Sequence, residues 1–541
     1  MSGSRTSEKK PVRAYRRGKP SGVGIVRELV EALRERPLPT LSENRALFAL
    51  LAIMLLGAVL RFNGLGFQSL WGEELASWDF STRETISQVI GGVRSDVQPP
   101  LYFLILRFAQ WIFGDSEWAL RLPSAFAGWL CIPAVYLLGK RLYSEREGLI
   151  AALFLAVLWA PIYYSQEARS YSMLILLSIL TTYFWWNVML GLRYRRELPA
   201  REAALYVIGA VLCAYLHYFG LLLVVLQGAA LAAIAYGTLQ SVMLLYAPVA
   251  LVYLPWLPSM AHQARSGTQS GEPTLQVLPD YFQFLFGRSG LLSLAAWTLL
   301  CFLLIRGWDD LRPRRKGRGI PPGLLLAAWA LGPFIVAYVA SQSMLTDENL
   351  LVSLPAIYLL LARSVTRTFS GRAATVFQGT MAVGLAGVGL AYLLFSMDYY
   401  TTPAKEQVRE AALYVVGHEG KDTLVVRCDT GDRLDFYLKT SETGERNDVE
   451  ACEARDFPKI EKRVKEGDYQ EVFHFISGTD PDPQMISMFQ RNFQPVDYER
   501  FDGASVVVYK VRPSVPEGLP QTEPPANLPQ PKPPASLPKR G

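Results

Sequence analysis

Charged residues are scarce in this chain of 541 residues. Asp, Glu, Lys and Arg make up 19% of the sequence, against about 25% in an ordinary soluble domain. Hydrophobic residues make up 50%, and they gather in repeated runs that are too long for the core helices of a soluble protein. This composition argues against a purely cytosolic enzyme and favours one large membrane domain.

Cysteine is also rare, and its five residues have no metal-binding spacing. Cys131, Cys213 and Cys301 lie in apolar runs, where a thiol packs as a small hydrophobic group. Cys428 and Cys452 lie in the polar C-terminal region without a CxxC motif, and they can form a disulfide if that region is extracytoplasmic.

Several catalytic signatures are missing from the sequence. It contains no GxxxxGK[ST] loop and no GxGxxG that follows a strand, which argues against a nucleotide-sugar donor used on the cytoplasmic side. It also contains no HExxH, no GxSxG and no array of metal ligands. We therefore predict no metal site from the motifs, although a divalent cation that assists the reaction stays open.

Positive charge is concentrated at the N-terminus. The formal net charge is +6, and residues 1–45 alone hold eleven Lys and Arg against five Glu, which is also +6. Such an arm can bind nucleic acid, but directly before a membrane span it marks the cytoplasmic side and contacts anionic lipid. It is too long and too charged for a cleavable signal peptide. We predict a cytoplasmic arm and no nucleic-acid partner.

Eleven runs are long and apolar enough to be transmembrane helices, which need about 20 residues to cross roughly 30 Å of hydrocarbon. A further run, residues 99–113, is short, begins with two prolines and carries Arg107 in its middle. The eleven runs are residues 46–65, 122–142, 148–165, 171–191, 203–218, 220–238, 241–257, 290–306, 322–340, 350–363 and 375–396.

The charge of the loops indicates that residues 99–113 do not cross the membrane. With the N-terminal arm inside and eleven crossings, every strongly basic loop lies on the cytoplasmic face, as the positive-inside rule requires. A twelfth crossing would move each of these loops outside. We therefore expect 99–113 to lie in the outer interface or to dip in and return. The odd count places residues 400–541 outside the cell membrane.

The C-terminal region differs from the membrane part in composition. Residues 405–417 read as an amphipathic helix, and short β-rich runs follow at residues 423–427, 472–477 and 505–511. From residue 516 the chain is Pro-rich and predicted to be disordered. The predicted fold is an all-α polytopic bundle with juxtamembrane helices and a C-terminal extracytoplasmic α/β domain. Its parts are an arm (1–45), a transmembrane domain (46–396), an α/β domain (397–515) and a tail (516–541).

Polar residues collect on the predicted outer face. The first outer loop, residues 66–98, holds Glu73 and Glu74 among Leu and Trp residues, where a carboxylate is costly unless it has a role or a partner. Glu167 and Arg169 share one short turn, and they fit a structural ion pair and a functional pair equally well. The other polar groups read more simply as solvated or interfacial side chains: Asp79, Asp96, Asp115 and His217.

An acidic pair with arginines at an outer membrane face fits one reaction class in particular. A lipid-phosphate sugar donor needs a cation that holds its phosphate, and the acceptor hydroxyl needs a carboxylate that removes its proton. The lipid tail needs an apolar groove between helices. These residues are consistent with that chemistry but do not by themselves require it.

Four motifs carry a resemblance to a known family. LWGEELAS, QPPLYF, GDSEWALRLPSAFAG and YYSQEARSYSMLILLS, in this order and spacing, resemble the membrane glycosyltransferases of the GT-C class. The chain is most similar to the bacterial relatives of protein O-mannosyltransferases and of lipid A aminoarabinose transferases. The resemblance covers residues 46–235 well and extends more loosely to residue 396.

The resemblance implies transfer of a sugar from a polyprenyl phosphate to an acceptor on a protein, lipid or glycan, with inversion at the anomeric carbon. It implies a base or acceptor-orienting role for Glu73, with Glu74 in support. Arg121 and Arg169 would hold the lipid phosphate. The remaining candidates for the donor site are Glu167, which would orient Arg169 or the sugar, and Gln98, Tyr102 and His217.

The chain departs from the family pattern at three positions. Glu73 stands where relatives have Asp, Gln98 stands where they have His or Lys, and Glu348 stands where they have Arg. Two other interpretations therefore stay open. One is a transporter or flippase for a lipid-linked solute, although the charges do not lie at mid-membrane and the two halves do not mirror each other. The other is a catalytically degenerate relative that acts as a binding scaffold.

Overall fold

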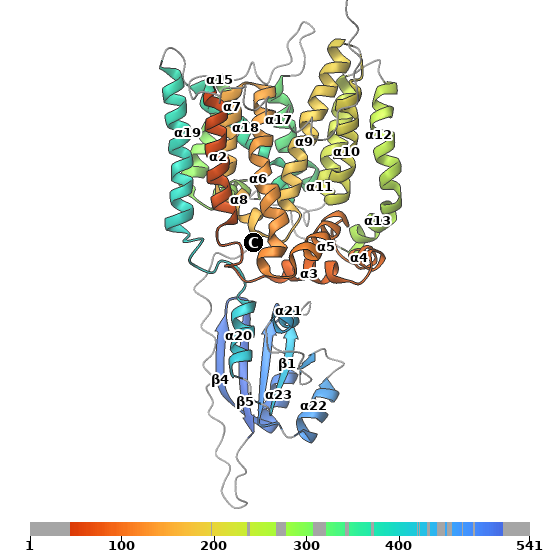
Figure 1. Cartoon of the computed structure of the whole chain (residues 1–541), viewed down its shortest axis with the longest axis vertical. Helices are drawn as coiled ribbons and strands as arrows, with labels where there is room; N and C mark the ends of the chain where they lie inside the picture. The colour runs from red at the N-terminus through yellow and green to blue at the C-terminus, as the bar shows by residue number, and fades with distance from the viewer. Residues whose placement is uncertain are drawn as a thin grey trace, which may run out of the picture. The chain divides into compact units, whose positions relative to one another are not determined.

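A computed structural model of the chain is mostly helical (Figure 1). By internal contacts the chain divides into two units, residues 1–52 and 53–541. Residues 1–43 of the predicted arm and the whole predicted tail lie outside the described residues. The structure describes residues 44–195, 197–234, 239–266, 277–306, 321–340, 346–368, 373–418, 420, 422–429, 433–440, 449–451, 457–467, 469–479 and 482–511.

Each of the eleven predicted runs contains a helix. Most of these helices are apolar on several sides, as expected where lipid replaces water as the surrounding solvent. They are α2 (Arg45–Phe62), α6 (Glu117–Leu142), α7 (Glu145–Val157), α9 (Tyr171–Leu190), α10 (Ala200–Leu216), α11 (Tyr218–Ile234), α12 (Leu239–Tyr253), α15 (Gly290–Arg306), α17 (Pro322–Ala340), α18 (Leu354–Thr368) and α19 (Ala374–Ala391).

The described helices support a multi-pass membrane protein but do not confirm the count of eleven crossings. Seven of them are long and apolar enough to cross a membrane, or up to nine if each of two bent pairs is one span. The bent pairs join α7 to α8 (Trp159–Tyr163) and α14 (Val277–Leu285) to α15. The two remaining predicted spans are α10 and α11, which have 17 residues each and are short against the length a crossing needs.

The break between α7 and α8 brings the chain to a buried turn. Pro161 has no N–H for the carbonyl four residues earlier, so the helix cannot continue, and Leu158 is extended with φ −76° and ψ 153°. The buried Arg61 of α2 fills the gap, because its guanidinium donates to the carbonyls of Leu155 at 2.6 Å and Ala156 at 2.9 Å. After α8 a 3₁₀ turn (Tyr164–Gln166) leads to the turn formed by residues 166–171.

Three short helices lie across one end of the bundle: α3 (Gly72–Thr82), α4 (Ile86–Val93) and α5 (Leu101–Phe113) (Figure 1). Helix α5 has 13 residues and is too short to cross the hydrocarbon, as predicted for 99–113. Arg107 of α5 donates to the carbonyls of Ser81 at 3.1 Å and Glu84 at 2.7 Å, at the C-terminal end of α3. A cation at a helix C-terminus is favourable, because the helix dipole is negative there.

The C-terminal part forms a five-stranded sheet in the order β2-β1-β3-β5-β4. Strands β2, β1 and β3 are parallel, while β5 is antiparallel to both of its neighbours. The strands are β1 (Thr423–Asp429), β2 (Val449–Ala451), β3 (Glu471–Ser477), β4 (Phe493–Phe501) and β5 (Ala504–Val511). The helices of this part are α20 (Val408–His418), α21 (Arg433–Thr440), α22 (Phe457–Glu466) and α23 (Pro483–Asn492).

Both faces of the central strands are buried, which explains their continuous apolar sequence. Val472 and Ile476 belong to a core with residues of α22 and α23, and the alternating residues Phe473 and Phe475 are buried as well. The predicted helix and the three predicted strands are confirmed, and Cys428 is disulfide-bonded. Its candidate partner Cys452 lies outside the described residues.

Candidate active site

The first turn of α3 carries the two adjacent carboxylates of the first outer loop. Trp71 caps the helix in an extended conformation, and its backbone N–H lies 3.4 Å from an oxygen of Glu74. Acidic side chains in a first turn are favourable, because the unpaired N–H groups there make the helix end positive. The two side chains then differ sharply in environment, since Glu74 is fully buried and the side chain of Glu73 is 45% exposed.

Glu74 forms a two-pronged ion pair with Arg121 of α6. The Nε and Nη2 atoms of Arg121 lie 2.7 Å from the two oxygens of Glu74. The remaining N–H groups of Arg121 donate to the carbonyls of Leu65, Gln68 and Ser69 at 2.7–3.0 Å. Arg121 therefore uses all five of its donors inside the protein, and it ties the segment before α3 to α6.

Lys405 lies between two buried carboxylates. Its Nζ is 3.2 Å from Glu74 and 3.5 Å from Glu167, and it also donates to the carbonyl of Gln166 at 3.1 Å. Neither oxygen of Glu167 has a hydrogen-bond partner. Burial lowers the pKa of Lys405, whereas the charges of Arg121 and Lys405 outweigh burial at Glu74 and lower its pKa to about 2.

Burial raises the pKa of Glu167 to about 7; the nearby Glu74 and Glu73 add to this effect, and Lys405 opposes it. A carboxyl whose pKa is higher in the folded than in the unfolded state contributes stability below its ordinary pKa of 4.5, and this contribution is lost as the pH rises toward about 7. We expect thermal unfolding of the Glu167→Gln variant to depend less on pH than that of the wild type between about pH 5 and 8. Equal pH dependence in the two proteins would contradict this prediction.

Glu73 contacts Arg169 at the edge of this buried network. The Nε atom of Arg169 lies 3.3 Å from Glu73 Oε2, and Nη1 lies 3.2 Å from the hydroxyl of Ser77, one turn further along α3. Arg169 is only 5% exposed. Its pKa is raised, because the neighbouring Tyr171, Glu73 and Asp96 outweigh burial. The pair therefore combines an accessible carboxylate with a fixed cation.

The other candidate residues surround the same turn, residues 166–171. Gln98 accepts a hydrogen bond from Ser170 at 3.1 Å. The hydroxyl of Tyr102 lies 3.4 Å from that of Ser124, which donates to the carbonyl of Arg169 at 2.9 Å. The ring of His217 lies 6.0 Å from that of Tyr171, and its Nδ1 accepts from the N–H of Phe219 at 3.1 Å. All eight residues singled out from the sequence thus belong to one connected cluster.

The three acidic residues that read as solvated charges fall into two groups. Asp79 pairs with Arg83 at 3.4 Å with its side chain 45% exposed, and the exposed Asp115 accepts from Gln110 at 2.8 Å. Asp96 differs, because one of its oxygens is buried without a hydrogen-bond partner and burial raises its pKa. Asp96 lies near enough to Arg169 for the cation to oppose this effect of burial on its pKa.

Lys405 is the functional candidate that the sequence did not reveal. It comes 331 residues after Glu74, in a polar stretch between the last span and α20 with no motif around it. Within the described ranges, no group of three or more His, Cys, Asp or Glu side chains is placed to hold a metal ion.

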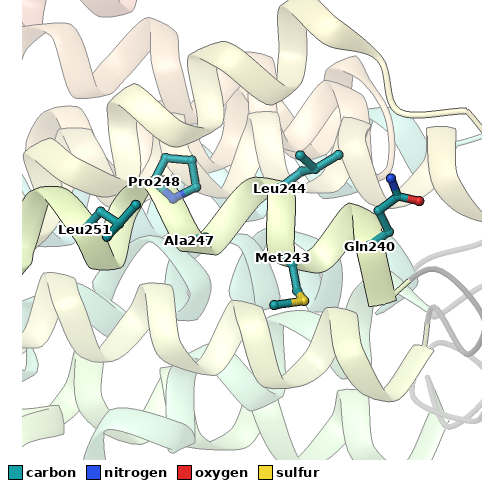
Figure 2. A pocket seen from close by; sticks show the side chains of 6 residues that line it. All are labelled: Gln240, Met243, Leu244, Ala247, Pro248 and Leu251. Atoms are coloured by element: carbon teal, nitrogen blue, oxygen red, sulfur yellow. The ribbon is translucent and has the colours of Figure 1, made fainter.

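A hollow lies on α12, and none of the residues that line it belongs to this cluster (Figure 2). It has a volume of about 470 Å³ and is lined almost entirely by apolar side chains. The lining residues Gln240, Met243, Leu244, Ala247, Pro248 and Leu251 all come from one helix. A shallow apolar hollow on the side of one helix is typical of a surface that contacts lipid, and apart from Gln240 it offers no polar side chain for chemistry on a sugar.

Comparison with known proteins gives a family match over part of the chain and one fold. Residues 97–262 match the model of the family described as dolichyl-phosphate-mannose-protein mannosyltransferase. No curated protein matches the chain.

Among solved structures, the chain is similar to ArnT from Cupriavidus metallidurans in the apo state, with 13% identity and a TM-score of 0.57 over 85% of this chain and 97% of that chain. It is also similar to ArnT bound to undecaprenyl phosphate, with 13% identity and a TM-score of 0.51 over the same shares of the two chains. The chain therefore has the fold of ArnT, and the predicted resemblance to the GT-C class is confirmed.

Proposed function

We propose that the chain is a membrane glycosyltransferase that moves a sugar from a polyprenyl-phosphate donor to an acceptor hydroxyl outside the cytoplasm, with inversion at the anomeric carbon. One observation carries the proposal. Glu73 is an accessible carboxylate 3.3 Å from the buried guanidinium of Arg169, on a helix that Glu74 and Arg121 anchor. The family match over residues 97–262 and the undecaprenyl phosphate bound to ArnT support the donor class.

In the proposed reaction, Glu73 accepts the proton of the acceptor hydroxyl as its oxygen bonds to the anomeric carbon. The bond between that carbon and the phosphate oxygen breaks, and the electron pair leaves with the polyprenyl phosphate. Arg169 stabilises the charge that develops on the leaving phosphate. Attack on the face opposite to the leaving group inverts the anomeric centre.

The roles of the two arginines differ in this proposal. Arg121 has no donor left for a phosphate, because its N–H groups already bind Glu74 and three backbone carbonyls. We therefore assign Arg121 to holding α3 and keep the phosphate role for Arg169. Gln98, Tyr102 and His217 remain candidates for donor contacts near the turn 166–171, and Glu167 remains a candidate for orienting Arg169 or the sugar.

The proposal also keeps the predicted topology, with the arm inside the cell membrane and the α/β domain outside. The test is incubation of membranes that contain the full chain with radiolabelled polyprenyl-phosphate sugars, with candidate acceptors added. A labelled product that requires the chain supports the function, and arms with and without EDTA test the need for a divalent cation. No product with any donor, together with uptake of the intact lipid-linked sugar into vesicles, would favour a transporter instead.

Replacement of Arg169 tests the phosphate role. We expect Arg169→Met to lower the rate of transfer about 100-fold or more, as for loss of one stabilising group in a catalytic site. Arg169→Lys keeps the positive charge but loses the planar, two-pronged guanidinium. Its rate of transfer is therefore expected to lie between those of the wild type and Arg169→Met. Arg83→Met is the matched control, because Arg83 forms an exposed pair with Asp79 at the other end of α3. An unchanged rate in Arg169→Met would contradict the assignment.

A further inference from the structure

The segment that leads into α3 is bonded to the part of the chain that follows the last span. The amide oxygen of Gln68 accepts from the N–H of Ala404 at 2.8 Å, and the N–H of Leu70 donates to the hydroxyl of Tyr437 at 2.7 Å. Ser69 accepts from the N–H of Arg409 at 3.0 Å. The backbone N–H of Leu70 before α3 is thus satisfied by α21, and the side chains of Gln68 and Ser69 in turn satisfy the backbone N–H groups of Ala404 and Arg409.

The N-terminus of α3 itself is capped from the same direction. Glu406 accepts a hydrogen bond from the N–H of Gly72 at 3.0 Å, and the same oxygen lies 2.7 Å from Nη1 of Arg433 in α21. Nη1 of Arg433 also donates to Ser477 of β3 at 3.2 Å. A carboxylate at a helix N-terminus complements the helix dipole, and here the sheet domain holds that carboxylate in place.

Gly72 has no room for a side chain. A Cβ atom at this position would lie 2.1 Å from Nη2 of Arg433. The guanidinium is held by Glu406 and Ser477, so it cannot move aside without breaking those bonds. The backbone of α3 therefore approaches Arg433 closely at the residue directly before Glu73.

Helix α21 also contacts α3 further along. The ring of Phe436 lies edge-to-face on that of Trp78, with a centroid separation of 5.1 Å and an interplanar angle of 80°. Both side chains are buried. Tyr437 donates in addition to Glu117 at 2.8 Å, at the start of α6. The contact between α21 and α3 thus spans two turns of α3.

We propose that Arg433 and Glu406 are positioning residues for transfer: through them the C-terminal domain fixes the first turn of α3 and thereby the carboxylate of Glu73. The inference rests on the proposed function, because it assigns Glu73 to the reacting hydroxyl. A displacement of about 1 Å at a reacting group can lower a rate on the order of 100-fold. The C-terminal domain then acts on the rate of transfer through the position of α3.

The first test separates positioning from binding. Arg433→Met in the full chain is expected to lower kcat by about 10- to 100-fold while KM for the donor changes less than about twofold, and Arg433→Lys is expected to restore part of the rate. Arg463→Met is the matched control, because Arg463 pairs with the buried Glu450 in the same domain without contact to α3. A wild-type kcat in Arg433→Met, or a change in KM alone, would overturn the proposal.

The close approach at Gly72 gives a second test. Gly72→Ala alone is expected to lower kcat, because the new methyl group displaces the guanidinium. In the Arg433→Met background, which removes that group, Gly72→Ala is expected to cause no further loss. If the two substitutions instead lower kcat independently, so that their fold-losses multiply in the double variant, the proposal is overturned. The effect of Gly72→Ala would then not arise from its contact with Arg433.

Amide hydrogen exchange distinguishes failure of this inference from failure of the proposed function. If the wild type transfers no sugar from any donor, the proposed function fails. The rate of amide exchange in residues 69–78 then still shows whether the C-terminal domain holds the first turns of α3 in place. Faster exchange in Arg433→Met than in Arg463→Met supports control of α3 by the domain. Equal exchange in the two variants overturns it.

Discussion

Glu73→Gln is expected to abolish sugar transfer and to leave the folded protein intact. The change is isosteric and removes only the basic carboxylate, whose loss as a proton acceptor costs about 10²- to 10⁴-fold in rate. The side chain of Glu73 is 45% exposed and Gln has the same size, so the loss of stability is expected to be smaller than in Glu74→Gln, where both cationic partners of a fully buried carboxylate lose their counter-charge. Transfer is measured in membranes with the radiolabelled donor, and stability by thermal unfolding in detergent.

Two further variants complete this experiment. Glu73→Asp keeps a carboxylate but withdraws it by about one bond length, so its rate of transfer is expected to lie between those of the wild type and Glu73→Gln. Asp79→Asn changes an exposed carboxylate two turns further along α3 and is expected to have no effect on transfer. Full activity in Glu73→Gln would remove Glu73 from the mechanism.

Glu74→Gln is expected to cause a large loss of stability, in contrast to Glu73→Gln, which is expected to lose activity and to keep its fold. It leaves Arg121 and Lys405 buried without the charge that both of them contact at 2.7 and 3.2 Å. Breaking a buried ion pair by removal of one partner costs about 3–5 kcal/mol. Thermal unfolding in detergent measures the loss, with Glu145→Gln as the control, because Glu145 and Lys140 form an exposed pair worth about 1 kcal/mol or less.

The pH dependence of stability gives an independent check on Glu74. Its pKa is lowered to about 2 in the folded protein, so its contribution is present above its ordinary pKa of 4.5 and is lost as the pH falls toward about 2. The wild type is therefore expected to lose stability in acid more steeply than Glu74→Gln. An unfolding temperature of Glu74→Gln within about 1 °C of the wild type at neutral pH would contradict the anchoring role.

The sequence predicted the general arrangement of this protein because its strongest signals are local. The apolar runs predicted the helices, and the short length of α5 agrees with the prediction that it does not cross the membrane. The motifs indicated eight residues that lie in one connected cluster. The sequence could not divide the roles of Glu73 and Glu74. Adjacent residues on a helix point about 100° apart, and only packing against α6 decides which of them is buried.

Two other features could be recognised only in the structure, because the sequence pattern around them is absent or misleading. Strand β4 is an edge strand with mostly exposed charged and polar residues, so it lacks the alternation that marks a strand with one buried face. Lys405 resembles any lysine of a polar linker, and its role comes from contacts with residues more than 230 positions earlier. Nothing in its sequence neighbourhood encodes those contacts.

The late position of Lys405 has a consequence for biosynthesis. Glu74 and Glu167 are synthesised long before residue 405. During the synthesis of most of the bundle, the two carboxylates therefore lack the positive charge of Lys405. The acidic cluster is complete only after α19 and the segment that follows it to residue 405 have been synthesised. A product truncated before residue 405 would lack this counter-charge for Glu74 and Glu167, so the proposed activity is expected to require translation past residue 405.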